Sequence, residues 1–101
     1  MEERRRAPRR EVEGQLATVP AVFNVRVLDI SVAGVLLQSN QPVEPGAKGR
    51  LRLNLDGSPF RADVEVQRIA ESDASSGYKF GATFVGLSPD LRHLIERFMT
   101  Q

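Results

Sequence analysis

The chain has 101 residues, 41% of them hydrophobic, and a net charge of +1, which suits one soluble domain with a single core. It contains no cysteine, which excludes disulfides, a thiolate nucleophile and cysteine-ligated metal sites. No apolar run approaches the roughly 20 residues that span a bilayer, and the N-terminus lacks the apolar segment of a signal peptide. We therefore expect a cytoplasmic protein that does not insert into membranes.

The first ten residues form a basic arm. They hold five of the 14 basic and two of the 13 acidic residues, so the arm carries +3 and the remainder −2. This asymmetry points to an anionic partner, and arginine can place two parallel hydrogen bonds on a phosphate or a guanine edge. Because Pro8 and like-charge repulsion oppose a helix, we predict a flexible, Arg-rich ligand-binding arm over residues 1–10. A single folded domain is expected over residues 11–101.

Six short strands are expected in the folded domain. Turn signals recur every 8–12 residues, the spacing typical of a β-sandwich or a closed β-barrel. The expected strands lie at about residues 11–17, 22–30, 35–38, 50–55, 60–66 and 78–84. A polar loop is expected over residues 71–77, before the last strand.

Period-two alternation supports these strands and fails at one place. Leu51, Leu53 and Leu55 share one face, and the Asp56-Gly57 pair that follows is typical of a two-residue hairpin turn.

Near the end of the second strand, the same alternation would place Val25, Val27, Asp29 and Ser31 on one face. Either the strand twists out of the core there, or two polar side chains are directed at a ligand.

The C-terminal segment changes to a helical period. Leu91, Leu94, Ile95 and Phe98 fall on one helical face. Ser88 suits the N-cap, with a proline and an aspartate next. We expect an amphipathic helix of about twelve residues that closes the mouth of a barrel. The sequence is also compatible with a homodimer that pairs through this helix.

Two motifs carry the functional hypothesis. Arg5 and Arg9 have the spacing R-x-x-x-R, and Asp29, Ser31 and Gly34 form D-x-S-x-x-G at the end of a strand. Each has a plain structural alternative. The arginines could belong to a solvated basic tail. The second motif could be an ordinary turn, in which Asp29 and Ser31 bond their own backbone and Gly34 supplies a positive φ.

In this order, and with an all-β body before a terminal helix, the two motifs resemble the PilZ domain family, bacterial receptors for cyclic di-GMP. The resemblance extends over nearly the whole chain and includes the Gly34-Val-Leu-Leu run and the Phe80-Gly-Ala-Thr-Phe84 strand. It implies an all-β fold, a six-stranded antiparallel β-barrel with a C-terminal helix. It also implies a receptor that orders its arm on the nucleotide and relays the signal to an unknown downstream protein.

The resemblance also assigns roles to individual residues. Arg5 and Arg9 would grip guanine edges, guanine faces and phosphates. Asp29 would accept from the N–H groups of a guanine, and Ser31 would contribute a hydroxyl contact. Gly34 would keep the turn tight and let the ligand approach the main chain.

Arg4 bears on the number of nucleotides bound. In the PilZ family, an arginine just before R-x-x-x-R accompanies binding of a stacked, intercalated pair of nucleotides. The resemblance thus favours a cyclic di-GMP dimer on this domain.

Other functions have less support in the sequence. A small nucleic-acid-binding barrel is disfavoured by the acidic body and by few aromatics, most of which occupy core-like positions. A PilZ-like adaptor that binds only protein, with the arm as a tether, is disfavoured by the intact motifs.

Catalysis has little support either. The only histidine, His93, falls on the polar side of the helix, and Asp63 and Glu65 lie on an exposed strand face. We expect no enzyme activity, no metal and no cofactor.

Overall fold

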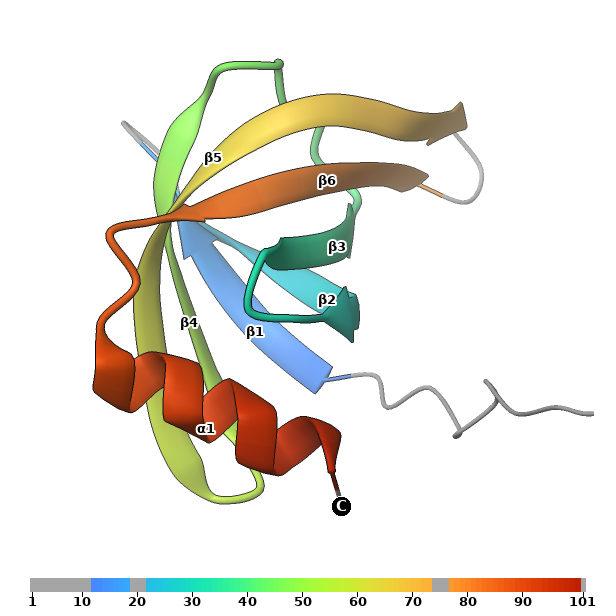
Figure 1. Cartoon of the computed structure of the whole chain (residues 1–101). Helices are drawn as coiled ribbons and strands as arrows, with labels where there is room; N and C mark the ends of the chain where they lie inside the picture. The colour runs from blue at the N-terminus through green and yellow to red at the C-terminus, as the bar shows by residue number, and fades with distance from the viewer. Residues whose placement is uncertain (1–11, 19–21, 74–76, 101) are drawn as a thin grey trace, which may run out of the picture.

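The protein is a closed barrel of six antiparallel strands, shown in a computed structural model that describes residues 12–18, 22–73 and 77–100 (Figure 1). The elements in chain order are β1 (Val12–Ala17), β2 (Val22–Ile30), β3 (Gly34–Ser39), β4 (Lys48–Leu55), β5 (Ser58–Asp73), β6 (Gly77–Val85) and α1 (Pro89–Met99). Around the barrel the strand order is β1-β2-β3-β6-β5-β4, and β4 pairs with β1 to close it. The expected barrel and helix are confirmed.

One boundary prediction is wrong. The sequence indicated a strand that ends near residue 66 and a polar loop over 71–77, but β5 continues to Asp73. Two register shifts interrupt its pairing with β6, between Val66 and Arg68 and between Ile69 and Glu71. At the first shift two consecutive exposed residues, Gln67 and Arg68, follow the buried Val66, so alternation is lost while the backbone ladder with β6 continues. A prediction from the alternation of hydropathy alone therefore places the end of β5 too early.

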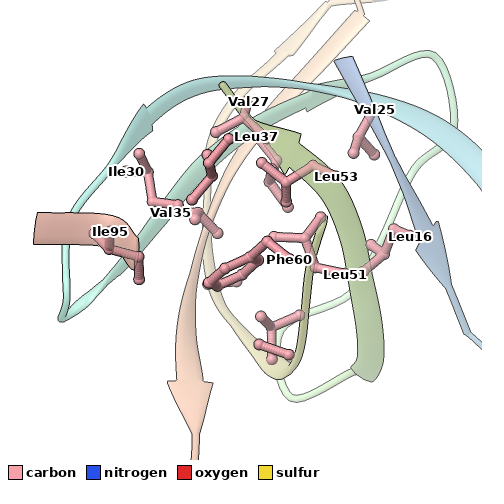
Figure 2. Packing of buried hydrophobic residues seen from close by; sticks show 14 of the residues in the cluster. Leu16, Val25, Val27, Ile30, Val35, Leu37, Leu51, Leu53, Phe60 and Ile95 are labelled. Atoms are coloured by element: carbon pink, nitrogen blue, oxygen red, sulfur yellow. The ribbon is translucent and has the colours of Figure 1, made fainter. Parts of the chain in front are cut away.

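Alternating side chains of the strands fill the interior of the barrel. Phe60, Phe80, Leu37 and Leu51 are each at most 2% exposed. Figure 2 shows Phe60 and Leu51 among aliphatic side chains contributed by several strands. Phe84 is partly buried and packs edge-on against Phe60, with ring centroids 5.7 Å apart. The phenylalanines of β5 and β6 thus belong to the core, as their positions predict.

The helix completes this core. Ser88 caps α1, because its hydroxyl accepts from the Leu91 amide at 3.2 Å. Ile95 and Phe98 are buried in the core cluster (Ile95 appears in Figure 2), and α1 packs against β4 and β5. The apolar face of the helix is thus covered by its own barrel, while Met99 remains 52% exposed. No helix in the described part of the chain is long and apolar enough to cross a membrane.

The Asp56-Gly57 turn has the predicted conformation. It joins β4 to β5, and both residues have positive φ angles, 54° and 86°. A type I′ hairpin turn requires positive φ at both central positions. The register of the β4–β5 hairpin is therefore set locally by this pair.

Candidate functional site

Asp29 lies on the outer surface of the barrel because of a β-bulge in β2. The β2–β3 register shifts between Val27 and Asp29, which leaves Leu28 as an extra residue. Val27 and Leu28 are both buried, and Asp29, the next residue, is exposed. Continued alternation would have placed Asp29 on the face of Val25 and Val27, and the bulge reverses the alternation so that Asp29 points outward instead. Among the residues that the structure describes, none pairs with the Asp29 carboxylate.

The turn after Asp29 holds Ser31 in a fixed position. The Ser31 amide donates to the Gly34 carbonyl oxygen at 2.9 Å, and the Gly34 amide donates back to the Ser31 carbonyl oxygen at 3.2 Å. The Ser31 hydroxyl oxygen accepts from the Ala33 amide at 3.2 Å. This is the backbone contact expected for an ordinary turn, and it uses the hydroxyl only as an acceptor. The O–H of Ser31 can still donate to a ligand.

Gly34 is required for a reason other than a positive φ. Its φ lies outside the left-handed region, which corrects the simple-turn interpretation. A Cβ at this position would instead lie 2.4 Å from the carbonyl oxygen of Ala82 on β6. Glycine therefore permits the close approach of β3 and β6 directly beside Ser31.

Asp29, Ser31 and Gly34 line one open hollow of about 410 Å³ on the outer surface of β2, β3, β5 and β6. Its floor and far side come from Leu36 of β3, from Gly81 and Thr83 of β6, and from Gln67 and Arg68 of β5. The Gln67 side-chain amide donates to the Thr83 hydroxyl at 3.0 Å. The second sequence motif thus belongs to a surface pocket.

Strand pairing arranges this pocket as a row. Asp29 is paired with Leu36, Leu36 with Gly81, and Gly81 with Arg68. Four adjacent strands therefore place a carboxylate at one end, an apolar side chain and a glycine in the middle, and a guanidinium at the other end. At about 4.8 Å per strand, the row extends about 14 Å along the sheet.

Arg68 was not singled out by the sequence. It is exposed and lines the pocket, and no carboxylate pairs with it among the side chains that the structure describes, which do not include Glu71 and Asp73. It belongs to no motif and lies where alternation along β5 is interrupted. Only the barrel topology, which places β5 two strands away from β3, brings it into the row with Asp29.

The arginines of the first motif, Arg4, Arg5 and Arg9, lie outside the described residues. The structure does place the start of β1, because Val12 is paired with Val27, two residues before Asp29. Arg9 precedes Val12 by three residues, so its Cα can lie at most about 10 Å from that of Val12. The structure brings together Asp29, Ser31 and Gly34, and the arm begins on the strand beside them.

A larger hollow of the described surface lies elsewhere. It measures about 530 Å³ and spans β1, β2, β4 and β5, with Arg52 and Arg61 in its lining. It contains none of Asp29, Ser31 and Gly34, so we assign the site to the smaller pocket.

His93 is an exposed helix residue whose Nδ1 lies 3.9 Å from Glu96. Within the described ranges, no three histidine or acidic side chains are grouped so as to hold a metal ion.

Comparison with known proteins agrees with this fold. The family model described as the PilZ domain matches residues 3–101, which include the barrel and all but the first two residues of the arm. The PilZ domain of YcgR from Escherichia coli, solved with c-di-GMP, is 15% identical, with a TM-score of 0.74 over 94% of this chain and 89% of that chain. A structure of YcgR from Escherichia coli in complex with c-di-GMP is 14% identical, with a TM-score of 0.73 over 94% of this chain and 45% of that chain. No curated protein matches the chain.

Proposed function

The chain belongs to the PilZ domain family, whose members are receptor domains without catalytic activity, and we propose that it is a receptor for cyclic di-GMP. The nucleotide would bind between the N-terminal arm and the pocket that holds Asp29, Ser31 and Gly34. PilZ domains are typically cyclic di-GMP receptors, and two structures of YcgR, which has the same fold, contain this ligand. The observation that carries the proposal is the exposed Asp29 carboxylate, without a described partner, in one pocket with Ser31 and Gly34.

The chemistry of these residues suits a guanine. Asp29 would accept from the N1–H and N2–H groups on the donor edge of the base, and the Ser31 hydroxyl would donate beside it. Arg5 and Arg9 would form fork-shaped hydrogen bonds to guanine O6 and N7 or to phosphate oxygens. One good bidentate pair of this kind contributes about 1–3 kcal/mol. The two halves of the site would thus contact different edges of the ligand.

The arm would act as the moving part of the receptor. We propose that residues 1–10 order over the pocket when the ligand neutralises their positive charge, with an ordering cost that lowers the net affinity. The start of β1 beside the end of β2 supports this arrangement, because it places the root of the arm next to the pocket. Arg4 would serve additional acceptor edges, so we propose two intercalated nucleotides per domain.

The readout would be a new surface formed by arm, ligand and barrel. A downstream protein would recognise this surface, and we propose that signalling takes place in the cytoplasm. Pairing of two copies through α1 stays a prediction of the sequence.

Calorimetric titration of cyclic di-GMP tests the proposal. The wild-type protein is expected to bind at tens of micromolar or tighter, and Arg5→Ala, Arg9→Ala and Ser31→Ala to bind at least fivefold more weakly. Arg61→Ala is the matched control, because Arg61 is exposed on the same barrel but lines a different hollow. A wild-type protein that gives neither heat nor a ligand-induced rise in melting temperature would refute nucleotide binding and favour the protein-only adaptor. Arginine variants that bind like wild type would show that the site is misplaced.

A further inference from the structure

We propose that Gly81 and Arg68 form the distal half of the ligand site, in which Gly81 keeps a flat floor open for a planar base and Arg68 binds acceptor atoms of the ligand. This inference rests on the proposed function and assigns two residues that neither motif contains. It follows from three observations: the surroundings of Gly81, the order of side chains along the pocket, and the environment of Arg68.

Gly81 has no structural need to be glycine. Every other glycine within a strand has a backbone oxygen within 3.0 Å of the position of a Cβ: Gly14, Gly34, Gly49 and Gly77. The turn glycines have positive φ angles. Gly81 alone among the eight has neither constraint, and a Cβ there would meet nothing within 4 Å. Glycine inside a strand is destabilising relative to alanine, so its presence at this position requires another explanation.

The place of Gly81 in the pocket supplies that explanation. Gly81 lies between Leu36 and Arg68 in the row of the pocket, on the outer surface of β6, whereas its neighbours Phe80 and Ala82 point into the core. A side chain at Gly81 would therefore project into the pocket. Without one, the backbone of β6 and the side chain of Leu36 form a shallow apolar platform. A purine face can lie on such a platform, because its two faces are apolar and its edges are polar.

Arg68 provides a positive charge that complements the negative charge of Asp29. The two side chains lie at opposite ends of the row, and neither has an oppositely charged partner among the side chains that the structure describes, residues 71–73 being outside that set. A guanine has the matching polarity, with N–H donors on one edge and the O6 and N7 acceptors on another. The row, at about 14 Å, is longer than one base. The long arginine side chain would span the remaining distance to guanine O6 and N7 or to a phosphate oxygen.

The test compares cyclic di-GMP affinity and thermal stability in Gly81→Val and Arg68→Ala. Gly81→Val is expected to bind at least tenfold more weakly with an unchanged or higher melting temperature, because valine fills the floor and its Cβ meets no neighbour within 4 Å. Arg68→Ala is expected to bind cyclic di-GMP about 5- to 150-fold more weakly, which is the equivalent of one bidentate pair. Arg68→Lys is expected to recover part of the lost affinity. The controls are Gln15→Val, which places a valine on the outer surface of β1, and Arg61→Ala on β5.

Salt dependence separates the two kinds of acceptor. If Arg68 contacts a phosphate, Arg68→Ala lowers the slope of log affinity against log salt concentration. If it contacts a guanine edge, the slope stays close to that of wild type, and both results support the inference. Gly81→Val and Arg68→Ala variants that bind within twofold of wild type would overturn it. The proposed function would survive that outcome if Ser31→Ala still weakened binding, whereas a wild-type protein that does not bind would overturn both.

Discussion

Asp29 and Arg68 occupy the two ends of one cross-strand row, and each directly follows a register shift in its own strand. Bulges redirect side chains and are frequent beside functional sites. In β2 the shift places Asp29 outside the barrel after two consecutive buried residues, and in β5 the shift precedes the exposed Arg68. The outward charges of the pocket therefore depend on irregularities in otherwise regular strands.

The carboxylate of Asp29 is expected to dominate recognition of the guanine donor edge. Asp29→Ala should weaken cyclic di-GMP binding by tenfold or more, since the N–H groups of the base would lose a charged acceptor. The affinity of Asp29→Asn should lie between those of wild type and Asp29→Ala, because the asparagine amide retains one carbonyl acceptor. Calorimetry measures both, with Asp90→Asn on the helix as a control for an exposed carboxylate. Equal affinity of Asp29→Ala and wild type would remove Asp29 from the site.

Arg4 is expected to determine stoichiometry. Titration of the wild-type protein should give two nucleotides per chain, and Arg4→Ala should give one. The reason is that a stacked pair presents acceptor edges which the other arm arginines cannot all serve. Arg6→Ala, which keeps the same net charge as Arg4→Ala, is the matched control. A wild-type stoichiometry of one would contradict the assignment of Arg4.

Two glycines on neighbouring strands should respond to alanine in opposite directions. Gly34→Ala forces a Cβ to within 2.4 Å of the Ala82 carbonyl oxygen, and overpacking of this kind costs about 1–3 kcal/mol. Gly81→Ala meets no neighbour and should stabilise the fold by up to about 1 kcal/mol. Urea unfolding measures both free energies. A destabilised Gly81→Ala would indicate a structural role for that glycine.

The helix should contribute strongly to the stability of the barrel. Ile95 is fully buried, so Ile95→Ala should lower the free energy of unfolding by about 2–5 kcal/mol. Ser88→Ala removes the N-cap hydrogen bond and should cost about 1 kcal/mol. His93→Ala, on the exposed side of α1, should stay within about 0.5 kcal/mol of wild type. Thermal and urea denaturation would rank the three, and a different order would contradict the packing of α1.

The sequence predicted the fold well because the elements that carry it follow local rules. Alternation in β4, the Asp56-Gly57 turn and the helical period after Ser88 each act within a few residues. The missed features depend on neighbouring strands. The bulge before Asp29 exists only in the pairing with β3, and the need for Gly34 arises from the approach of β6.

The pocket was only partly predictable for the same reason. The D-x-S-x-x-G motif marks one side of it within a single turn. Arg68 and Gly81 lie far along the chain and carry no motif, so their place beside Asp29 follows only from the strand order of the barrel. The arm arginines fall outside the described residues, and their assignment stays a prediction.

The closed strand order limits how a partner protein can recognise this domain. Each of the six strands pairs with a neighbour on both sides over part of its length. A partner could therefore add a strand of its own only where one strand outruns its neighbour, as β5 does beyond its pairing with β4 at residues 58–65. Elsewhere, recognition has to use side chains on the convex surface. A few substitutions on that surface could redirect the domain to another partner without disturbing the backbone of the barrel.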